Sequence, residues 1–333
     1  MMRNFFIIFF LFFLLGSCSP ENIHEDVFEG SAQGTSFHIK LIYSQNFSDD
    51  YVREKDIKKW LSHYNRIASP WDGESEISNL NSGDTVDISP ELFELCQLAI
   101  QMKQETNGIL EPTLEPIIDG WGFGINNGYL DYNDSSKVES LMKLVGNDDW
   151  LPTSTGRWAW PRNIKLNFMS LAQGHSVDII IDSLRSRGVY SAFVEVGGEI
   201  RTYGKKSFGD DFTVGIEKPA LDKQDELQVI IPLRNRALAT SGNYRNFRVD
   251  SATGIKFGHT ISAFTGWPIQ TEVLSSTIIG PSCAMADALA TAFLAMGLNK
   301  SKLWLDQNPE WDAYLIYIDE KGNFRNWTTL SDL

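Results

Sequence analysis

The chain has few cysteines and no cluster of basic residues, and both absences restrict what it does. Three cysteines in 333 residues are too few for a disulfide scaffold in a chain of this size. The formal net charge is −14, from 43 acidic and 29 basic residues. Nucleic-acid backbones are bound by clustered positive charge, so we expect no nucleic-acid partner. Any phosphate that this protein handles is expected to need a metal ion.

The sequence also lacks the glycine-rich motifs of the common nucleotide-binding folds. Neither the G-x-G-x-x-G pattern of dinucleotide-binding domains nor a P-loop occurs. After the N-terminal segment there is no repeat, no low-complexity tract and no Pro- or Ser-rich linker. Hydrophobic residues make up 42% of the chain, which is ample for one core. We therefore expect a single domain over residues 28–333.

The N-terminal apolar run is too short to cross a membrane. Phe5–Leu15 follows Arg3 and gives eleven apolar residues, typical of an export signal, whereas a helix needs about 20 to span the bilayer. Leu15-Gly16-Ser17-Cys18 resembles a bacterial lipobox, whose cysteine is lipidated and becomes the first mature residue. We expect a signal peptide at 1–17, a polar tether at 18–27, and a lipid anchor at Cys18 on the periplasmic side of a membrane in the bacterial cell envelope. An ordinary secretory signal is the alternative.

Periodicity predicts a mixture of helices and strands. Residues 35–43 alternate as a strand does. Strands are also expected in 190–204, with a Gly-Gly turn or point of close approach, and through 212–219, 226–233 and 276–280. Residues 56–68, 89–108 and 172–188 show helical spacing, the second with a Ser89 cap and a stop at Gly108. The irregular order of these elements favours an α+β fold with mixed or antiparallel sheets and packed helices over a doubly wound sheet.

An acid and a hydroxyl stand out in the small, apolar stretch PSCAMADALATAFLAMG, residues 281–297. A helix beginning near Ala284 places Asp287 and Thr291 on one face, because residues four apart are neighbours. A carboxylate and a hydroxyl together supply half of a site for a hard cation such as Mg²⁺. The alternative is an acid that complements the helix dipole beside a threonine that only packs.

A histidine and three aromatic residues are further candidates. His259, in GIKFGHTISAFTGWP, is either a general base or a structural histidine. Trp71, Trp121 and Phe123 suit stacking on a flat ring, or packing in the core or in loops. Cys96 and Cys283 lie in apolar surroundings, so we expect both to be buried structural residues.

The order of these features resembles the ApbE family of flavin transferases, from about Gln33 to Gly297. The stretches that carry the resemblance are QGTSFHI, SPWDGESEISNLN, TNGILEPTLEPIIDGWGFG, LAQGHSVD with VEVGGEIRTYG, and the series ATSGNYRNF, GHTISAFTGWP and ADALATAFLAMG. The resemblance implies an enzyme that takes FAD, uses Mg²⁺, and transfers the FMN half of FAD to a threonine hydroxyl of an exported flavoprotein, with release of AMP. Subunits of ion-pumping or electron-transfer complexes are the acceptors it implies.

The same resemblance implies a role for individual residues. Asp287, Thr291 and the backbone carbonyl of Ser170 would hold the metal, and His259 would accept the threonine proton. The Gly197–Gly198 turn and Glu199 would border the cleft. FAD would lie across Gln33, Trp71, Leu110, Glu111, Pro112, Gln173 and Ile261.

Three positions depart from the family pattern. Asn167 stands where Asp is common, Gln173 where Lys is common, and Ala263-Phe264 where Asp-Pro is common. Each change removes a charge from the expected site, while the proposed metal residues and His259 remain. Two other functions therefore stay open: an FAD pyrophosphatase that yields FMN and AMP, and a lipid-anchored protein that binds FAD without chemistry.

Overall fold

The structure is a computed structural model that describes residues 24–44, 51–126, 128, 130–147, 151–159, 164–217, 227–243, 247–250 and 253–331. Its helices are α1 (Glu54–Ala68), α2 (Glu76–Ser82), α3 (Pro90–Glu105), α4 (Glu115–Gly120), α5 (Ser135–Met142), α6 (Ala172–Ser186) and α7 (Cys283–Gln307). Its strands are β1 (His24–Ala32), β2 (Thr35–Tyr43), β3 (Thr85–Ile88), β4 (Gly156–Ala159), β5 (Ser191–Val196), β6 (Glu199–Tyr203), β7 (Phe212–Glu217), β8 (Leu227–Leu233), β9 (Ala237–Gly242), β10 (Phe247–Val249), β11 (Lys256–Gly258), β12 (Val273–Gly280), β13 (Asp312–Ile318) and β14 (Phe324–Thr328).

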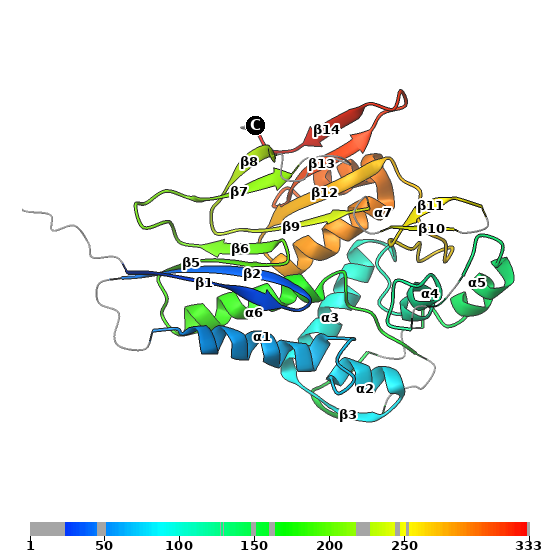
Figure 1. Ribbon diagram of the computed structural model, residues 1–333, viewed down its shortest axis with the longest axis horizontal. Helices are drawn as coiled ribbons and strands as arrows, with labels where there is room; N and C mark the ends of the chain where they lie inside the picture. Colours follow the sequence, from blue (N-terminus) through cyan, green and yellow to red (C-terminus); the bar gives the residue numbers. More distant parts are fainter. Residues whose placement is uncertain are drawn as a thin grey trace, which may run out of the picture.

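The centre of the fold is an eight-stranded sheet in the order β1-β2-β5-β6-β9-β12-β13-β14 (Figure 1). Neighbouring strands in it pair antiparallel. Strands β1 and β2 form a hairpin of nine residue pairs, from His24 opposite Tyr43 to Ala32 opposite Thr35. The predicted α+β class is confirmed. The first strand begins at His24, so the last four residues of the predicted tether belong to the sheet. Residues 1–23, with the predicted signal peptide and Cys18, lie outside the described part.

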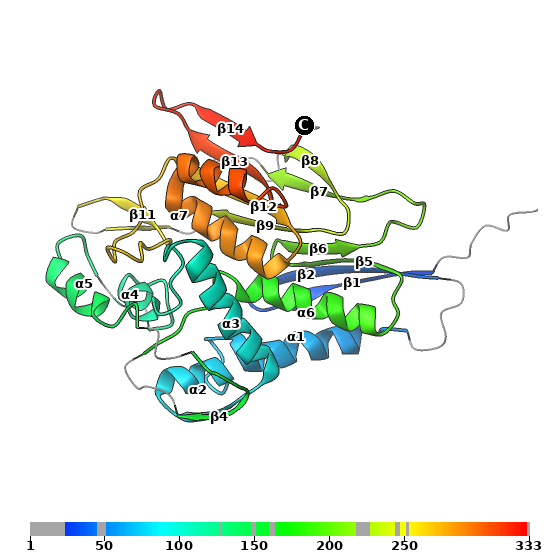
Figure 2. The ribbon, with the colours of Figure 1, turned by 180° about the vertical axis from the view of Figure 1, so that it is seen from behind.

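Helices cover one face of the sheet, and the β7–β8 hairpin covers part of the other (Figures 1 and 2). Helix α7 packs on β9 and β12, and α6 packs on β5 and β6 and against α7. The predicted helical face of α1 is confirmed, because Ile57, Leu61, Tyr64 and Ile67 are all buried. No helix within the described ranges is long and apolar enough to cross a membrane.

A smaller lobe beside the main sheet consists of α4, α5 and the β10–β11 hairpin (Figure 1). Its core is formed around Trp121, which is 1% exposed and donates its Nε1–H to the carbonyl of Gly266 at 2.7 Å. Trp121 is therefore a core residue and does not face a ligand. Cys96 and Cys283 are free and fully buried, which confirms the prediction for both.

Candidate functional site

The N-terminal half of α7 carries the predicted metal residues. Ser282 caps this helix, and Asp287 and Thr291 follow one turn apart, as the sequence predicts. Asp287 is 6% exposed, and its Oδ2 accepts a hydrogen bond from the Gly174 amide at 3.1 Å. Thr291 Oγ1 lies 3.1 Å from Ser241 Oγ on β9. Asp287 thus contacts the start of α6, and Thr291, one turn later on the same face of α7, contacts β9.

The carboxylate of Asp287 is in an electrostatically costly place. Burial raises the pKa of Asp287 to about 7, although the hydrogen bond from Gly174 opposes this. A buried carboxylate with one amide donor is stabilised either by a proton or by a nearby cation. Asp287, Thr291 and the Ser170 carbonyl are the oxygen groups here that could hold a hard divalent cation. Within the described ranges, no group of three or more His, Cys, Asp and Glu residues could hold a metal, so any metal site here relies on hydroxyl and carbonyl oxygens as well.

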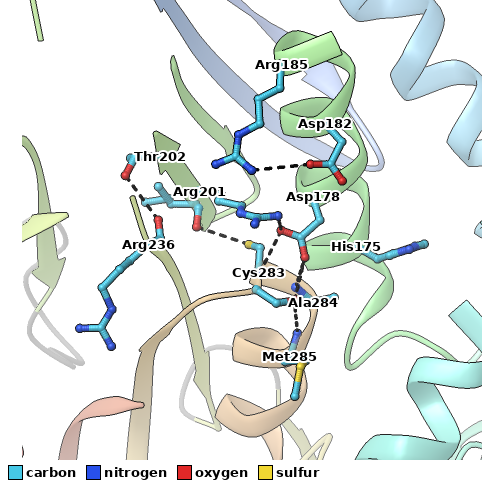
Figure 3. Close-up of polar contacts among 12 residues, drawn as sticks. His175, Asp178, Asp182, Arg185, Arg201, Thr202, Arg236, Cys283, Ala284 and Met285 are labelled. Carbon is cyan, nitrogen blue, oxygen red and sulfur yellow. Dashed lines mark hydrogen bonds and ion pairs between the residues drawn. The ribbon is translucent and has the colours of Figure 1, made fainter. Parts of the chain in front are cut away.

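An aspartate on α6 fixes the beginning of α7 (Figure 3). Asp178 Oδ1 accepts hydrogen bonds from Arg201 Nη1 at 2.6 Å and from the Cys283 amide at 3.0 Å. Asp178 Oδ2 accepts from Ser282 Oγ at 2.9 Å and from the Ala284 amide at 3.0 Å. The Asp178 carboxylate thus accepts hydrogen bonds from two backbone N–H groups that the first turn of α7 leaves unpaired. Its ion pair with Arg201 also connects α6 to β6. The sequence alone indicates no role for Asp178.

Two adjoining cavities lie beside these helices. The larger has a volume of about 510 Å³ and is lined by Gln33, Trp71 and Gln173, among others. The smaller, of about 170 Å³, is lined by a set that includes six residues of the expected site: Leu110, Glu111, Ser170, His259, Ile261 and Thr291. Both are lined by Asn167 and Met169, so they meet along this segment. Nine of the residues expected from the sequence therefore line these two adjoining cavities.

The predicted base lies in the smaller cavity. His259 follows β11 directly, and its ring centroid lies 6.2 Å from that of Phe123 on the cavity wall. His175, for which the sequence indicated no role, is 3% exposed, and its Nδ1 lies 3.0 Å from the Tyr64 hydroxyl oxygen. Of these two histidines, only His259 is placed to act on a ligand.

Asn167 links two walls of the cleft. The backbone N–H of Asn167 donates to the Pro112 carbonyl at 2.7 Å, and the side-chain Nδ2 donates to Glu115 Oε2 at 2.5 Å. Pro112 does not line either cavity among the described residues and contributes through this carbonyl. Burial raises the pKa of Glu115 to about 7, against the hydrogen bond from Asn167. An aspartate at position 167 would add a second carboxylate beside Glu115, which gives a physical reason for the neutral amide here.

Glu111 is fixed at the boundary of the cleft. Lys103 Nζ lies 2.7 Å from Glu111 Oε2, and Thr113 donates to Glu111 Oε1 through its amide at 3.0 Å and its hydroxyl at 2.7 Å. These contacts leave the Leu110–Glu111 backbone in a defined position on the cavity wall.

Trp71 is not fixed by burial in this way, because 61% of its surface is exposed at the rim of the larger cavity. Such an indole is available for stacking on a flat ring.

Comparison with known proteins identifies the architecture. The family model described as "ApbE family" matches residues 33–315, which is most of the chain. The chain belongs to the ApbE family. A curated relative from Vibrio cholerae named FAD:protein FMN transferase is 29% identical over 335 residues, covering 99% of this chain and 98% of the relative. A Haemophilus influenzae protein of the same name is 29% identical over 304 residues, covering 88% and 86%.

Solved ApbE structures have the same fold. The flavin transferase ApbE from Vibrio cholerae superposes with a TM-score of 0.80 at 26% identity, covering 93% of this chain and 98% of the other. The apo form of the Pseudomonas stutzeri flavinyl transferase ApbE gives a TM-score of 0.79 at 26% identity, covering 92% and 95%. The resemblance noted from the sequence is therefore confirmed at the level of family and fold.

Proposed function

We propose that this ApbE-family protein is an Mg²⁺-dependent flavin transferase that moves the FMN half of FAD to a threonine hydroxyl of an exported acceptor protein and releases AMP. The observation that carries this proposal is the pair of adjoining cavities: His259, Thr291 and Ser170 line the smaller one, and the buried carboxylate of Asp287 lies one helical turn before Thr291. Family membership supports the reaction class, and the residues that line the two cavities support the assignment of the individual groups.

FAD occupies the two adjoining cavities in this proposal. The exposed indole of Trp71 stacks on a ring system at the rim, and Gln33 and Gln173 offer amide groups to polar atoms. The Leu110–Glu111 segment and Ile261 line the narrower end, which leads to Thr291. The larger cavity lies within the usual volume range of small-molecule sites, about 300–1,000 Å³.

The chemistry requires a base and stabilisation of negative charge. The acceptor hydroxyl attacks the phosphorus of the FMN half, an O–P bond to that phosphorus forms, and the pyrophosphate bond to AMP breaks. His259 takes the proton of the attacking hydroxyl, because a neutral alcohol is a poor nucleophile near neutral pH. Asp287, Thr291 and the Ser170 carbonyl would hold a divalent cation, which would supply Lewis acidity for the developing charge on the phosphate oxygens.

Two other functions fit the same cleft. In a pyrophosphatase, water replaces the acceptor and free FMN and AMP are formed; in a carrier, FAD is bound and stays intact. The three are separated by incubating the protein with Mg²⁺, FAD and an acceptor domain that bears a flavinylation threonine, then measuring intact masses and nucleotides. We expect the acceptor to gain one FMN. AMP formation that is equal without the acceptor would select the pyrophosphatase, and unchanged FAD would select the carrier.

Asp287→Ala is expected to abolish the transfer in that experiment. Asp182→Ala is the matched control, because Asp182 lies on α6 with its side chain 71% exposed and only a 3.9 Å contact to Arg185. We expect this control to retain full activity. Transfer by the Asp287→Ala protein at the normal rate would contradict the proposed cation site.

We further propose that Cys18 is lipidated and anchors the protein to a membrane on the periplasmic side. Residues 18–23 span at most about 20 Å before β1 begins at His24. Gln33, which lines the cleft, directly follows the nine-residue strand β1, whose far end at Ala32 lies about 27 Å from His24. An anchor at Cys18 would therefore lie toward the His24 end of β1, opposite Gln33, and would leave the cleft accessible to an exported protein domain. Flotation of the wild-type protein with membranes, lost in Cys18→Ser, is the expected result; flotation of both proteins would contradict it.

A further inference from the structure

Glu199 is a buried acid that the proposed mechanism does not use. It begins β6, is 7% exposed, and its Oε2 has no hydrogen-bond partner within the described part of the chain. Residues two apart on a strand share a face, so Glu199 lies on the same face as Arg201. Arg201 contacts Asp178 of α6, which places this face of β6 against α6 and the beginning of α7. Glu199 therefore points toward α6 and toward the beginning of α7, the helix that carries Asp287.

Three carboxylates surround the first turn of α7. Burial raises the pKa of the Cys283 thiol well above its usual value, and nearby Asp178, Glu199 and Asp287 raise it further. Arg201 neutralises one of the three, because its Nη1 lies 2.6 Å from Asp178 Oδ1. The described residues form no ion pair with Glu199 or Asp287. Two buried negative charges would thus remain uncompensated if both acids were ionised, which is unfavourable in a protein interior.

The charge of Asp287 affects the ionisation of Glu199. Burial raises the pKa of Glu199 well above its usual value of 4.5, and the neighbouring Asp287 raises it further. A protonated Glu199 would keep one hydroxyl donor, yet Oε2 faces no acceptor or donor among the residues described. A buried polar atom of this kind needs a partner beyond the residues described, and a bound cation would supply one.

We propose that Glu199 supplies the second negative charge of the divalent-cation site whose first charge is Asp287. With Asp178 neutralised by Arg201, a doubly charged cation balances Glu199 and Asp287. Mg²⁺ is commonly held by one or two carboxylates and keeps several water molecules, which donate hydrogen bonds to nearby acceptors. This inference rests on the proposed metal dependence, and it adds a residue that the family resemblance placed only at the border of the cleft.

Glu199→Gln separates this proposal from a purely structural role. The amide keeps the shape and hydrogen-bonding capacity of a neutral glutamic acid but cannot ionise. If Glu199 only fills space as a protonated acid, the variant will bind the cation as the wild type does. If Glu199 supplies charge to the cation, affinity will fall about tenfold or more, the range typical for removing a residue that supports a metal site.

Glu195→Gln is the matched control. Glu195 lies four residues earlier on β5, where its neighbour Val196 is paired with Glu199, so its side chain is on the opposite face of the sheet. Burial raises its pKa too, but its Oε1 accepts a hydrogen bond from the Gly198 amide at 2.8 Å. We expect this variant to change cation affinity less than twofold.

The measurement is the binding of Mn²⁺, a spectroscopic substitute for Mg²⁺, to the full mature protein by electron paramagnetic resonance, with and without FAD. Glu199→Asp, which keeps the charge, is expected to bind more tightly than Glu199→Gln, and thermal unfolding verifies that each variant is folded. Unchanged Mn²⁺ affinity in a folded Glu199→Gln protein overturns the proposal, as does a wild type that binds no cation. A wild type that binds Mn²⁺ through Glu199 but transfers no FMN would refute the proposed function and leave this inference standing.

Discussion

The amide N–H of Gly174, in the first turn of α6, donates a 3.1 Å hydrogen bond to Oδ2 of Asp287 on α7. This contact joins residues 113 positions apart in the sequence and fixes the orientation of the proposed metal ligand. It needs a glycine at position 174 for a steric reason. A Cβ there would lie 2.4 Å from the Cys283 carbonyl oxygen and 2.8 Å from the Ala284 Cα, and both are backbone atoms that cannot move aside independently.

Gly174→Ala is therefore expected to separate α6 from α7. We expect the free energy of unfolding to fall by about 1–3 kcal/mol, as for other overpacked interiors, and FMN transfer to be lost. Urea denaturation and the transfer assay measure the two effects. Gly73→Ala is the control, because a Cβ at Gly73 meets no atom within 4 Å. Equal stability of the two variants would show that the close approach of the helices is not required.

Asp178→Asn tests the cap of α7. Asparagine keeps one acceptor oxygen but places an NH₂ group against donors, and Arg201, with a side chain only 17% exposed, loses its counter-charge. We expect a loss of about 2–3 kcal/mol in the free energy of unfolding. Asp182→Asn, one turn further on α6 in an exposed pair with Arg185, should change stability by less than about 0.5 kcal/mol (Figure 3). A loss below about 1 kcal/mol for Asp178→Asn would show that the Ser282 cap alone holds the helix.

The pH dependence of stability tests the buried Glu115. Its pKa is about 7 in the folded protein and 4.5 as a free side chain. Because the folded pKa is raised, the stabilising contribution is complete below pH 4.5 and is lost as pH rises through about 7. The shift corresponds to a loss on the order of 3 kcal/mol. Glutamine stays neutral, so Glu115→Gln should gain stability relative to the wild type between pH 5 and pH 8.

Urea denaturation at both pH values, in the presence of EDTA, measures that gain. Glu139→Gln on the exposed side of α5 is the control and should follow the wild type at both pH values. A constant difference in stability between Glu115→Gln and the wild type from pH 5 to pH 8 would mean that Glu115 is ionised throughout this range.

Trp71 is expected to contribute to FAD affinity and not to folding, because it is 61% exposed. Stacking of an aromatic side chain on a base is worth about 1–3 kcal/mol, so Trp71→Ala should weaken FAD binding by about tenfold or more. Trp71→Phe should retain part of this affinity. Fluorescence titration with FAD measures both, and thermal unfolding should show unchanged stability. Phe208→Ala, 95% exposed in the loop after β6, is the control; if it weakens FAD binding as much as Trp71→Ala does, the stacking role is wrong.

Local patterns in the sequence predict much of the fold but only part of the site. The Asp287–Thr291 spacing follows from helical periodicity, and the Ser89 cap of α3 is confirmed by its hydrogen bond from the Leu92 amide. The short helices α4 and α5 were not predicted, because helices of one or two turns carry little periodicity. The resemblance to a known family, and not the residue pattern, placed Ser170 and Gln33 at the cleft.

Other features of the site depend on distant parts of the chain. The contact of Asp178 with Ser282 joins residues 104 positions apart, so no local pattern reveals it. The same holds for Glu199, because the burial of its carboxylate without a hydrogen-bond partner among the described residues depends on the packing of β6 against α6 and α7. The reason for an asparagine at position 167 is visible only from its contact with Glu115, because burial raises the pKa of Glu115.

The most direct test of the proposed reaction is to quantify AMP and FMN-modified acceptor in the same samples over time, with FAD and Mg²⁺ supplied. The account predicts one AMP for each FMN attached, no AMP above background without the acceptor, and neither product with the Asp287→Ala protein. AMP that accumulates at the same rate without the acceptor would contradict the transfer reaction, and modified acceptor formed by Asp287→Ala would contradict the role of the carboxylate on α7.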